Sequence, residues 1–300
     1  GDTFGHYRML GLLGRGGMAE VYLAEPLEAP GSRVAIKRLL PHYADNRKFV
    51  SMMRDEARIA TAIEHPNVAR VFEFGTVDGT HFMAMEYVDG VDLGRVLRRL
   101  KAGGLPLPLP ASLYIGACVA HGLHAAHSLL DADGHRSGVI HRDVSPHNVL
   151  VSHAGEVKLI DFGVAKARSN STKTKSGVIK GKLQYMSPEQ AQAKPVDARA
   201  DVFSLGMTLY RMIAGRLPFT GQTDYQIYDQ ILRKPTPPPR HFVPELPARV
   251  EAVLLRALRK DRAARFDSAG AMAAVLDRAI DELEPGYGPA HLAALLAGVI

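Results

Sequence analysis

The chain has 300 residues, of which 46% are hydrophobic and 23% charged, the proportions of an ordinary globular protein with a sizeable core. Its net charge of +6 is spread along the chain, with no basic run carrying interleaved aromatic residues, so we expect no nucleic-acid binding. No stretch of about 18 apolar residues exists, which excludes a membrane-spanning segment within the sequence.

The single cysteine, Cys118, excludes an intrachain disulfide and favours a reducing compartment. It lies in an apolar helical pattern, so we expect a buried structural thiol rather than a nucleophile. No signal peptide is visible. We therefore expect a cytoplasmic protein, and a longer or membrane-tethered parent protein is compatible with the sequence.

Short runs rich in β-branched and aromatic residues, bounded by Gly or Asp, predict strands in the first third of the chain. One helix is expected among them, from about Asn46 to Ile63, because its apolar residues recur at three- to four-residue spacing. Pro66 ends it, since proline disfavours helix at the preceding residue. The predicted strands are Tyr7–Leu13, Glu20–Glu25, Arg33–Leu39, Val71–Thr76 and His81–Met85.

The remainder predicts mainly helices, joined to the strand-rich part near Tyr87–Gly90. A motif-dense centre with two short strands, Asn148–Val151 and Val157–Ile160, lies between Val139 and Glu189. The pattern indicates an α+β fold with a small antiparallel sheet followed by a larger helical lobe, and ligands often bind at such joins. The predicted helices are Ala111–Leu130, Asp201–Ala214, Thr223–Leu232, Leu246–Leu258 and Ser268–Leu283.

A glycine-rich segment, Gly14-Arg15-Gly16-Gly17-Met18-Ala19-Glu20-Val21, lies between the first two predicted strands. Glycines let the backbone approach phosphates closely and offer its N–H groups to them. A simple hairpin turn is the alternative, and the segment alone leaves both open. It is not a Walker loop, because no Gly-Lys-Ser/Thr follows.

Val34-Ala35-Ile36-Lys37 ends a predicted strand in a lysine, which is usually a solvated edge residue. Glu56 lies on the apolar face of the following helix. Because an unpaired buried carboxylate is unfavourable, Glu56 needs a cationic partner, and Lys37 is the natural one. Such a pair would aim the Lys37 ammonium at the α- and β-phosphates of a nucleotide.

The strongest local signal is His141-Arg142-Asp143-Val144-Ser145-Pro146-His147-Asn148. Its Asp143 carboxylate can accept a hydroxyl proton, and the Asn148 amide oxygen can ligate a metal. Asp161-Phe162-Gly163 follows, and the hard carboxylate oxygens of Asp161 suit Mg²⁺. Each triplet is common by chance, but this order and spacing are not.

In these motifs the chain resembles Hanks-type (eukaryotic-like) protein kinases. The resemblance runs from about Tyr7 to Leu283: Ser187-Pro188-Glu189 is similar to the end of a kinase activation segment, and Arg265 falls where kinases place the arginine that pairs with that Glu. Asp201-Val202-Phe203-Ser204-Leu205-Gly206 resembles the helix that anchors the large lobe. The glycine loop and Tyr185-Met186-Ser187-Pro188-Glu189-Gln190 are similar to bacterial serine/threonine kinases, particularly those of myxobacteria.

This resemblance implies a protein-kinase-like two-lobed fold, with an N-lobe at 1–88, a C-lobe at 89–284 and a C-terminal extension at 285–300. It implies that ATP is covered by Leu13–Val21, with adenine between Ala35 and Leu150. Met85 would be the gatekeeper, Glu86–Val88 the hinge that reads adenine, and Asp92 a ribose contact.

The resemblance also implies the chemistry. Asn148 and Asp161 would hold Mg²⁺, or Mn²⁺ as an alternative, beside the Lys37–Glu56 pair. Asp143 would orient and deprotonate the hydroxyl of a protein substrate. The γ-phosphoryl group would then transfer in line, helped mainly by positioning and charge stabilisation.

The sequence departs from the family pattern at three positions. Ala19 replaces the third glycine of the loop, for which we expect a modest effect. Ser145 stands where serine/threonine kinases carry a lysine, and loss of such a donor can reduce the rate by ~10²–10³. Lys182, after Gly181, stands where they carry a threonine. We hypothesise an exchange, in which Lys182 supplies the cation and Ser145 helps to position Asp143; the alternative is that Lys182 is an exposed loop residue.

A regulatory site is expected in the hydroxyl-rich segment from Ser169 to Gly177. Thr174 and Ser176 match the activation-loop autophosphorylation sites of bacterial kinases by position. A phosphate there could pair with Arg142 and Lys166 and order the loop. An unmodified polar loop is the alternative.

We expect the chain to transfer the ATP γ-phosphoryl group to protein Ser/Thr hydroxyls and to phosphorylate its own activation loop. Whether a homodimer carries out this autophosphorylation is left open. A nucleotide-binding pseudokinase scaffold is the alternative, disfavoured by the intact motif residues. A small-molecule phosphotransferase is disfavoured by Ser187-Pro188-Glu189 and Arg265, which imply a peptide-docking shelf. Tyr185 replaces the Trp typical of tyrosine kinases, so we choose Ser/Thr.

Overall fold

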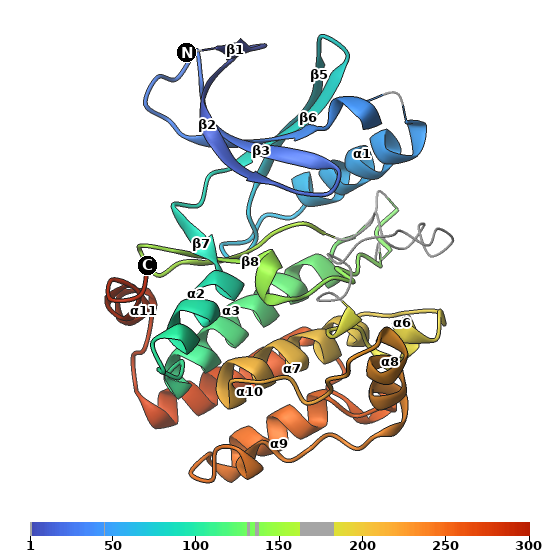
Figure 1. Cartoon of the computed structure of the whole chain (residues 1–300), viewed down its shortest axis with the longest axis vertical. Coiled ribbons are helices and arrows are strands. Elements are labelled where there is room, and N and C mark those ends of the chain that lie inside the picture. Colours follow the sequence, from blue (N-terminus) through green and yellow to red (C-terminus); the bar gives the residue numbers. More distant parts are fainter. Residues whose placement is uncertain (1, 45, 131–132, 136–137, 163–182) are drawn as a thin grey trace.

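The structure, a computed structural model, describes residues 2–44, 46–130, 133–135, 138–162 and 183–300. The predictions for Lys166, Thr174, Ser176 and Lys182 lie outside these residues. The chain forms a smaller, sheet-rich N-terminal lobe above a larger helical lobe (Figure 1). The predicted α+β, two-lobed fold class is confirmed.

The N-terminal lobe is built on one antiparallel sheet of order β1-β2-β3-β4-β6-β5. Helix α1 (Arg47–Thr61) begins at the N-cap Asn46, whose side chain accepts from Lys48 N, and packs against β5. Its buried face carries Met53, Ala57 and Ala60, at the spacing that predicted the helix. The strands are β1 (Thr3–Phe4), β2 (Tyr7–Arg15), β3 (Ala19–Pro26), β4 (Val34–Leu39), β5 (Val71–Val77) and β6 (Thr80–Glu86).

The C-terminal lobe is a helical bundle around α7, in which 13 of the 16 residues from Arg199 to Ala214 are buried. A helix that is apolar on nearly every face lies inside a core, and here α3, α9 and α10 surround it. The helices are α2 (Leu93–Ala102), α3 (Leu109–His127), α6 (Pro188–Ala191), α7 (Arg199–Ala214), α8 (Asp224–Arg233), α9 (Ala248–Ala257), α10 (Ala269–Leu283) and α11 (Pro289–Leu296).

A second, three-stranded sheet lies where the lobes meet. Its order is β7-β8-β9, formed by Gly90–Asp92, Val149–Ser152 and Val157–Leu159. Contacts with the N-terminal lobe include a bond from Asn67 Nδ2 to Val157 O at 3.0 Å and an ion pair of 2.6 Å between Lys158 Nζ and Glu86 Oε1. This sheet therefore positions the motif residues of the central loops beside the strand-rich lobe.

Three helices, α2, α11 and the single turn α6, were not predicted. In α2 only Leu93, Val96 and Leu100 provide a narrow apolar stripe among arginines, and the Asp92 side chain caps it by accepting from Arg95 N at 3.0 Å. Helix α11 buries Leu292 and Leu296 against the large lobe and lies beside α2 (Figure 1). Its short apolar run has no strong helical period, so only tertiary contacts make it a helix.

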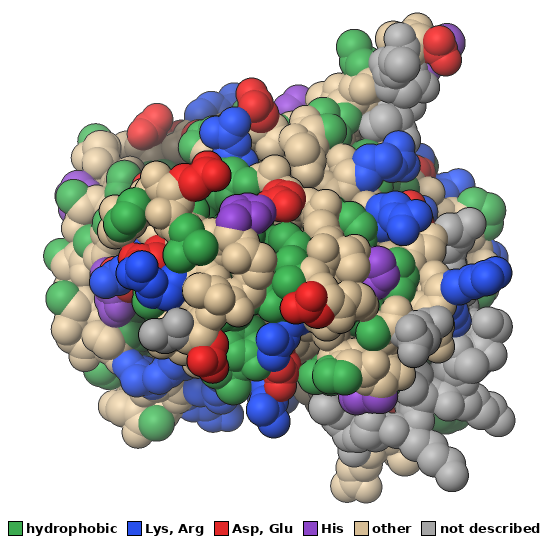
Figure 2. Space-filling view, turned by 90° about the horizontal axis from the view of Figure 1, so that it is seen from above, with side chains coloured by type: hydrophobic (Ala, Val, Ile, Leu, Met, Phe, Trp, Pro, Cys, Tyr) green, Lys and Arg blue, Asp and Glu red, His purple; other side chains and the backbone are tan. Residues whose placement is uncertain are grey.

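Two general expectations can be checked on the described residues. Cys118 is buried in α3, as predicted for a structural thiol. Among the described residues, no helix has both the length and the apolar character that a bilayer crossing demands. The face seen from above carries basic and acidic side chains interspersed with apolar ones (Figure 2).

Candidate active site

Lys37 joins the two lobes at the predicted site. Its ammonium lies 2.7 Å from Glu56 Oε1 and 2.8 Å from Asp161 Oδ1, so the predicted Lys37–Glu56 pair is confirmed and a third residue is added. Burial alone would lower the pKa of Lys37, but the two carboxylates raise it above its usual range. Lys37 is thus a fixed, protonated cation in a site with little access to water.

Glu56 is buried on the inner face of α1, with 6% of its surface exposed. Burial raises the pKa of its carboxyl above the usual range, and the Lys37 ammonium opposes that rise. Met85, the proposed gatekeeper, lines a small hollow of about 20 Å³ together with Glu56, Asp161 and Phe162. The helix, the sheet and the central loop therefore converge around the Lys37 ammonium.

One face of the N-terminal sheet carries the adenine-side residues predicted from the sequence. Val21 pairs with Lys37, and Ala35 pairs with Met85, so these side chains share a face with the lysine. Glu20 lies on the opposite face. Its carboxylate contacts Arg15 at 2.9 Å and Tyr22 at 2.6 Å, so the structure does not bring this side chain to the cleft.

The glycine-rich loop is a tight hairpin between β2 and β3. Gly16 N donates to Ala19 O at 2.8 Å, and Leu40 N donates to Met18 O at 2.9 Å. A Cβ atom at Gly14 or Gly17 would meet nothing within 4 Å among the described residues. Neither glycine has a positive φ, so the backbone conformation does not require glycine at these positions, and the open space leaves room for close approach of a ligand. Leu13 is 48% exposed at the same edge.

Asp143 and Asn148 are held together within the central loop. Asn148 Nδ2 donates to Asp143 O at 2.7 Å and to Asp143 Oδ2 at 2.9 Å. This orientation turns the amide oxygen of Asn148, the atom predicted to bind a metal, away from Asp143. Ile160 N donates to Asn148 O at 3.0 Å, so Asp161 begins beside the same residue. The two predicted metal ligands are therefore brought to one place.

His141 supports this loop from beneath. Its Nδ1 accepts from Asp143 N at 3.2 Å, so its Nε2–H donates to Ile160 O at 3.0 Å. The ring also contacts Phe162, with 4.7 Å between ring centroids. Burial lowers the pKa of His141, so the imidazole is neutral and its tautomer is defined by these two bonds.

Asp201, at the start of α7, anchors the loop and was not predicted as a site residue. Its carboxylate accepts from His141 N and Arg142 N, each at 2.8 Å, and contacts His127 Nε2 at 2.7 Å. Burial alone would raise its pKa, but these partners lower it. A lone carboxylate in an otherwise apolar helix was the available signal, because such a group needs buried donors.

Two non-glycine residues of the site have left-handed backbone conformations. Arg142 has φ of 65° and Asp161 has φ of 58°. Such conformations cost on the order of 1–3 kcal/mol each and persist where the surroundings over-determine them, often at functional sites. Here they occur directly before Asp143 and at Asp161, the two carboxylates of the predicted site.

Of the two residues in the hypothesised exchange, Ser145 is the one that lies within the described residues. It is 1% exposed, and its Oγ has no hydrogen-bond partner among the described residues. A buried hydroxyl without a partner costs about 1–3 kcal/mol, so this site needs a polar neighbour.

Three residues of the predicted nucleotide site lie on the second sheet and the connection before it. Asp92 pairs with Leu150 in register, and Val88 is buried just before β7. Asp92 Oδ1 caps α2 and lies 3.3 Å from His147 Nδ1, which together lower its pKa against the effect of burial. Its carboxylate is thus shared between helix capping and the cleft edge.

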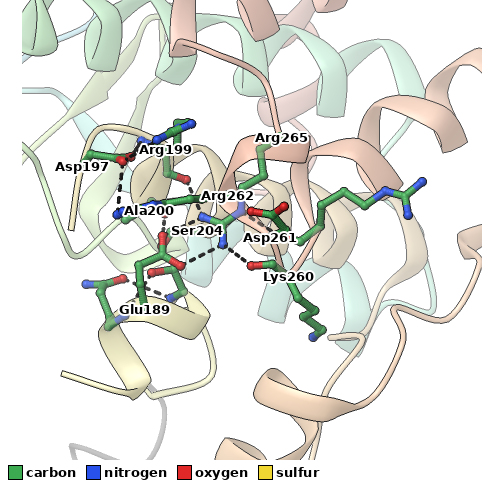
Figure 3. A network of polar contacts seen from close by, with 12 residues as sticks. Glu189, Asp197, Arg199, Ala200, Ser204, Lys260, Asp261, Arg262 and Arg265 are labelled. Carbon is green, nitrogen blue, oxygen red and sulfur yellow. Dashed lines mark hydrogen bonds and ion pairs between the residues drawn. The ribbon is translucent and has the colours of Figure 1, made fainter. Parts of the chain in front are cut away.

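Arg265 and Glu189 lie deeper in the C-terminal lobe as the resemblance implied. The guanidinium donates to both carboxylate oxygens, at 2.7 and 2.8 Å, and to the carbonyls of Arg199 and Lys260 (Figure 3). Arg265 is 1% exposed, so this pair is fully desolvated on the arginine side. It fastens the segment Ser187–Gln190 to α7 and the loop before α10.

Comparison with known proteins agrees with this geometry. The family model described as Protein kinase domain matches residues 7–275. Tyrosine-protein kinase MasK of Myxococcus xanthus (strain DK1622) is 41% identical over 299 residues, covering 99% of this chain and 46% of MasK. Serine/threonine-protein kinase PrkC of Bacillus subtilis (strain 168) is 35% identical over 277 residues, covering 92% of this chain and 41% of PrkC.

A solved structure gives the same result for the fold. The crystal structure of the Mycobacterium tuberculosis PknI kinase domain matches with a TM-score of 0.68 and 31% identity, covering 93% of this chain and 97% of that one. The chain spans less than half the length of the two curated relatives named above. The resemblance inferred from the motifs is confirmed over nearly the whole chain, which therefore belongs to the protein kinase domain family.

Proposed function

We propose that this chain transfers the γ-phosphoryl group of ATP to serine and threonine hydroxyls of proteins. The observation that carries the proposal is the convergence of Lys37, held between Glu56 and Asp161, with Asp143, held by Asn148. A cation for phosphate oxygens and a carboxylate for a hydroxyl proton are the two groups that this reaction needs. The similarity to serine/threonine-protein kinase PrkC supports the serine/threonine class.

The base is Asp143. Its peptide N–H is bonded to His141 and one carboxylate oxygen to Asn148, so the carboxylate has a defined orientation toward the cleft. It accepts the proton of the substrate hydroxyl while Lys37 holds the phosphates of ATP. Positioning of this kind supplies most of the acceleration in phosphoryl transfer.

A divalent cation fits the pair Asn148 and Asp161. Both offer hard oxygen atoms, and two protein ligands suit Mg²⁺, which keeps waters and phosphate oxygens in its shell. When bound, the cation neutralises charge on the phosphates. Mg²⁺ is the expected ion and Mn²⁺ the alternative. Adenine lies against Ala35 and Leu150, next to Met85 and the hinge Glu86–Val88, and the ribose lies near Asp92.

The exchange of Ser145 and Lys182 is part of this proposal. The buried Ser145 Oγ, without a described partner, supports a polar neighbour at this position. Lys182 then supplies the cation that Ser145 lacks. The test is turnover of Lys182→Thr beside Ser145→Lys/Lys182→Thr: the single variant should lose activity and the double variant should recover it. Full activity of Lys182→Thr alone would contradict the exchange.

Tyrosine is the second candidate acceptor, because the relative MasK carries the name of a tyrosine kinase. In addition, Ser145 replaces the lysine that usually distinguishes serine/threonine kinases. Phosphoamino-acid analysis of a labelled protein substrate separates the two. Phosphoserine and phosphothreonine are expected, and phosphotyrosine alone would assign the chain to the second class.

Activation by autophosphorylation at Thr174 and Ser176 is the proposed regulation, with Arg142 and Lys166 as phosphate partners. Two copies of the chain would phosphorylate each other, so the initial rate should rise with the square of protein concentration. Phosphopeptide mapping after incubation with ATP locates the sites. Phosphate found only elsewhere in the chain would contradict this assignment.

The decisive experiment is incubation of the chain with radiolabelled ATP, a divalent cation and a protein substrate, beside Asp143→Asn. Label should enter the substrate with the wild type and fall by at least ~10² with the variant, which keeps the shape but not the basicity of the group. Nucleotide binding without transfer by the wild type would favour the pseudokinase alternative.

We assign the N-lobe to 1–88, the C-lobe to 89–284 and a docked extension to 285–300.

A further inference from the structure

The peptide unit between Arg142 and Asp143 is held at both of its polar ends. Its N–H, on Asp143, donates to His141 Nδ1 at 3.2 Å. Its C=O, on Arg142, accepts from Gln190 Nε2 at 2.9 Å. Because the plane of this peptide sets the direction in which the Asp143 side chain leaves the backbone, both bonds bear on the base.

This peptide follows a residue in a strained conformation. Arg142 has φ of 65°, which a non-glycine residue keeps only when its surroundings enforce it. Asp201 holds the Arg142 N–H at 2.8 Å, and Gln190 holds the Arg142 C=O. The strained residue is therefore clamped from opposite sides by α7 and α6.

The Gln190 side chain is itself oriented by its own segment. The side-chain Oε1 accepts from Ser187 N at 3.1 Å, and the backbone N–H of Gln190 donates to Ser187 Oγ at 3.4 Å, a reciprocal capping box at the start of α6. With the oxygen engaged by an N–H, only the amide nitrogen can face the Arg142 carbonyl. The orientation of the amide is thus determined by chemistry at both ends.

The segment that carries Gln190 is anchored independently. The neighbouring Glu189 is 7% exposed and makes two bonds to Arg265. Gln190 therefore reaches the catalytic loop from a fixed support. In the proposed function, this same segment forms the end of the surface on which the protein substrate docks.

We propose that Gln190 is a positioning residue, which holds the peptide before Asp143 and links the substrate-docking segment to the base. The inference rests on the proposed kinase function. It predicts an effect on turnover rather than on nucleotide binding, because Gln190 bonds to the loop of Asp143 and the nucleotide phosphates are held by Lys37 on the other lobe.

The test is Gln190→Glu, measured by steady-state kinetics with ATP and a peptide or protein substrate. Glutamate keeps the length and the oxygen that caps α6, since Glu suits this third helical position, but it replaces the donor with an acceptor facing a carbonyl. The kcat should fall by on the order of 10², the loss expected when a reacting group is displaced by about 1 Å. The KM for ATP should stay within about twofold, because nucleotide binding does not depend on this bond.

The chain offers a matched control in α8. Gln226 occupies the same third position, its N–H donates to the Thr223 cap at 3.2 Å, and its Oε1 accepts from Gln222 N at 2.8 Å. Gln226→Glu makes the identical chemical change on a surface helix, so kcat should match the wild type. A second variant, Gln190→Met, removes the donor without adding charge and should also lower kcat.

A pH profile separates positioning from simple damage to the fold. The new carboxyl of Gln190→Glu would regain a donor when protonated, so the ratio of its kcat to that of wild type should rise as the pH falls. Equal kcat for wild type and both Gln190 variants would overturn the inference, as would a ratio that is flat with pH. Absence of phosphoryl transfer by the wild type would instead contradict the proposed function.

Discussion

Lys37 on β4 and Glu56 on α1 form an ion pair of 2.7 Å across the face of the N-terminal sheet, with both side chains largely buried. The same ammonium reaches Asp161 at 2.8 Å. The pair thus fixes the distance between α1 and the sheet, and the third contact fixes the central loop relative to both. In the proposed function this arrangement is what presents a cation to the nucleotide.

Glu56→Gln should lower kcat/KM by about 10², because Lys37 would lose the carboxylate that aims it at the phosphates. Lys37→Met should cost ~10²–10³, since the cation itself is removed. The measurement is turnover with ATP and a protein substrate. Glu25→Gln, which breaks the more exposed Arg8–Glu25 pair at 2.6 Å on the same lobe, is the control and should leave turnover unchanged. Wild-type turnover in Lys37→Met would contradict the assigned role.

Glu189→Gln should destabilise the chain by about 3–5 kcal/mol at pH 7, because it leaves the buried Arg265 without its charge partner. Although burial would raise it, the pKa of Glu189 is held below its ordinary value of 4.5 by Arg265. The folded pKa lies below the unfolded one, so this stability is present above pH 4.5 and is lost as pH falls through the folded pKa.

Denaturant unfolding of wild type and Glu189→Gln between pH 3 and pH 7 would measure this linkage. The difference in unfolding free energy between the two should be ~3–5 kcal/mol at neutral pH and should become smaller as the pH falls. Asp229→Asn, in an exposed pair with Arg233 at 3.2 Å, is the surface control. It should change stability by less than about 1 kcal/mol. A difference for Glu189→Gln that is constant with pH would argue against an ionised pair.

Removal of divalent cations with a chelator should abolish phosphoryl transfer, and Mg²⁺ should restore it. Asn148→Ala should raise the Mg²⁺ concentration for half-maximal rate by roughly 10–100-fold, because an oxygen ligand is lost. It should also weaken the orientation of Asp143, whose carboxylate accepts from Asn148 at 2.9 Å. An unchanged Mg²⁺ dependence in this variant would remove Asn148 from the metal site.

Gly155→Ala should loosen the docked helix α11. Gly155 has φ of 80°, and a Cβ there would lie 1.9 Å from Pro289 O, so the methyl group and α11 cannot both keep their places. Gly79→Ala is the matched control, with φ of 75° and nothing within 4 Å of the added atom among the described residues. Both variants carry the strain of a positive φ at alanine. The free energy of unfolding should fall by a further 1–3 kcal/mol, roughly, in Gly155→Ala.

Thermal unfolding and limited proteolysis of residues 285–300 would measure this difference. Faster cleavage in that segment is expected only for Gly155→Ala, because only this change overlaps with the backbone of α11. Equal cleavage in the two variants would mean that α11 does not depend on the contact at Gly155.

The sequence by itself determined the fold class, most secondary structure and the Lys37–Glu56 pair. Helix α1 and strands β2 to β6 of the first sheet follow from local periodicity, which depends only on neighbouring residues. The pair could be predicted because a glutamate on an apolar helix face has few ways to be satisfied. The order and spacing of the motifs then identified the family, which the comparisons confirm.

Only the tertiary structure decided how the base is held. The bonds from Asp201 and Gln190 to Arg142 join residues 59 and 48 positions apart in the chain. Periodicity carries no information about such contacts, because they depend on which carbonyls and N–H groups the packed helices bring within reach. Glu20 was assigned to the nucleotide by a continuous motif, but the pairing of β3 places its carboxylate on the face opposite Val21, where it contacts Arg15. Local pattern therefore named the reacting groups, and long-range packing decided their orientation.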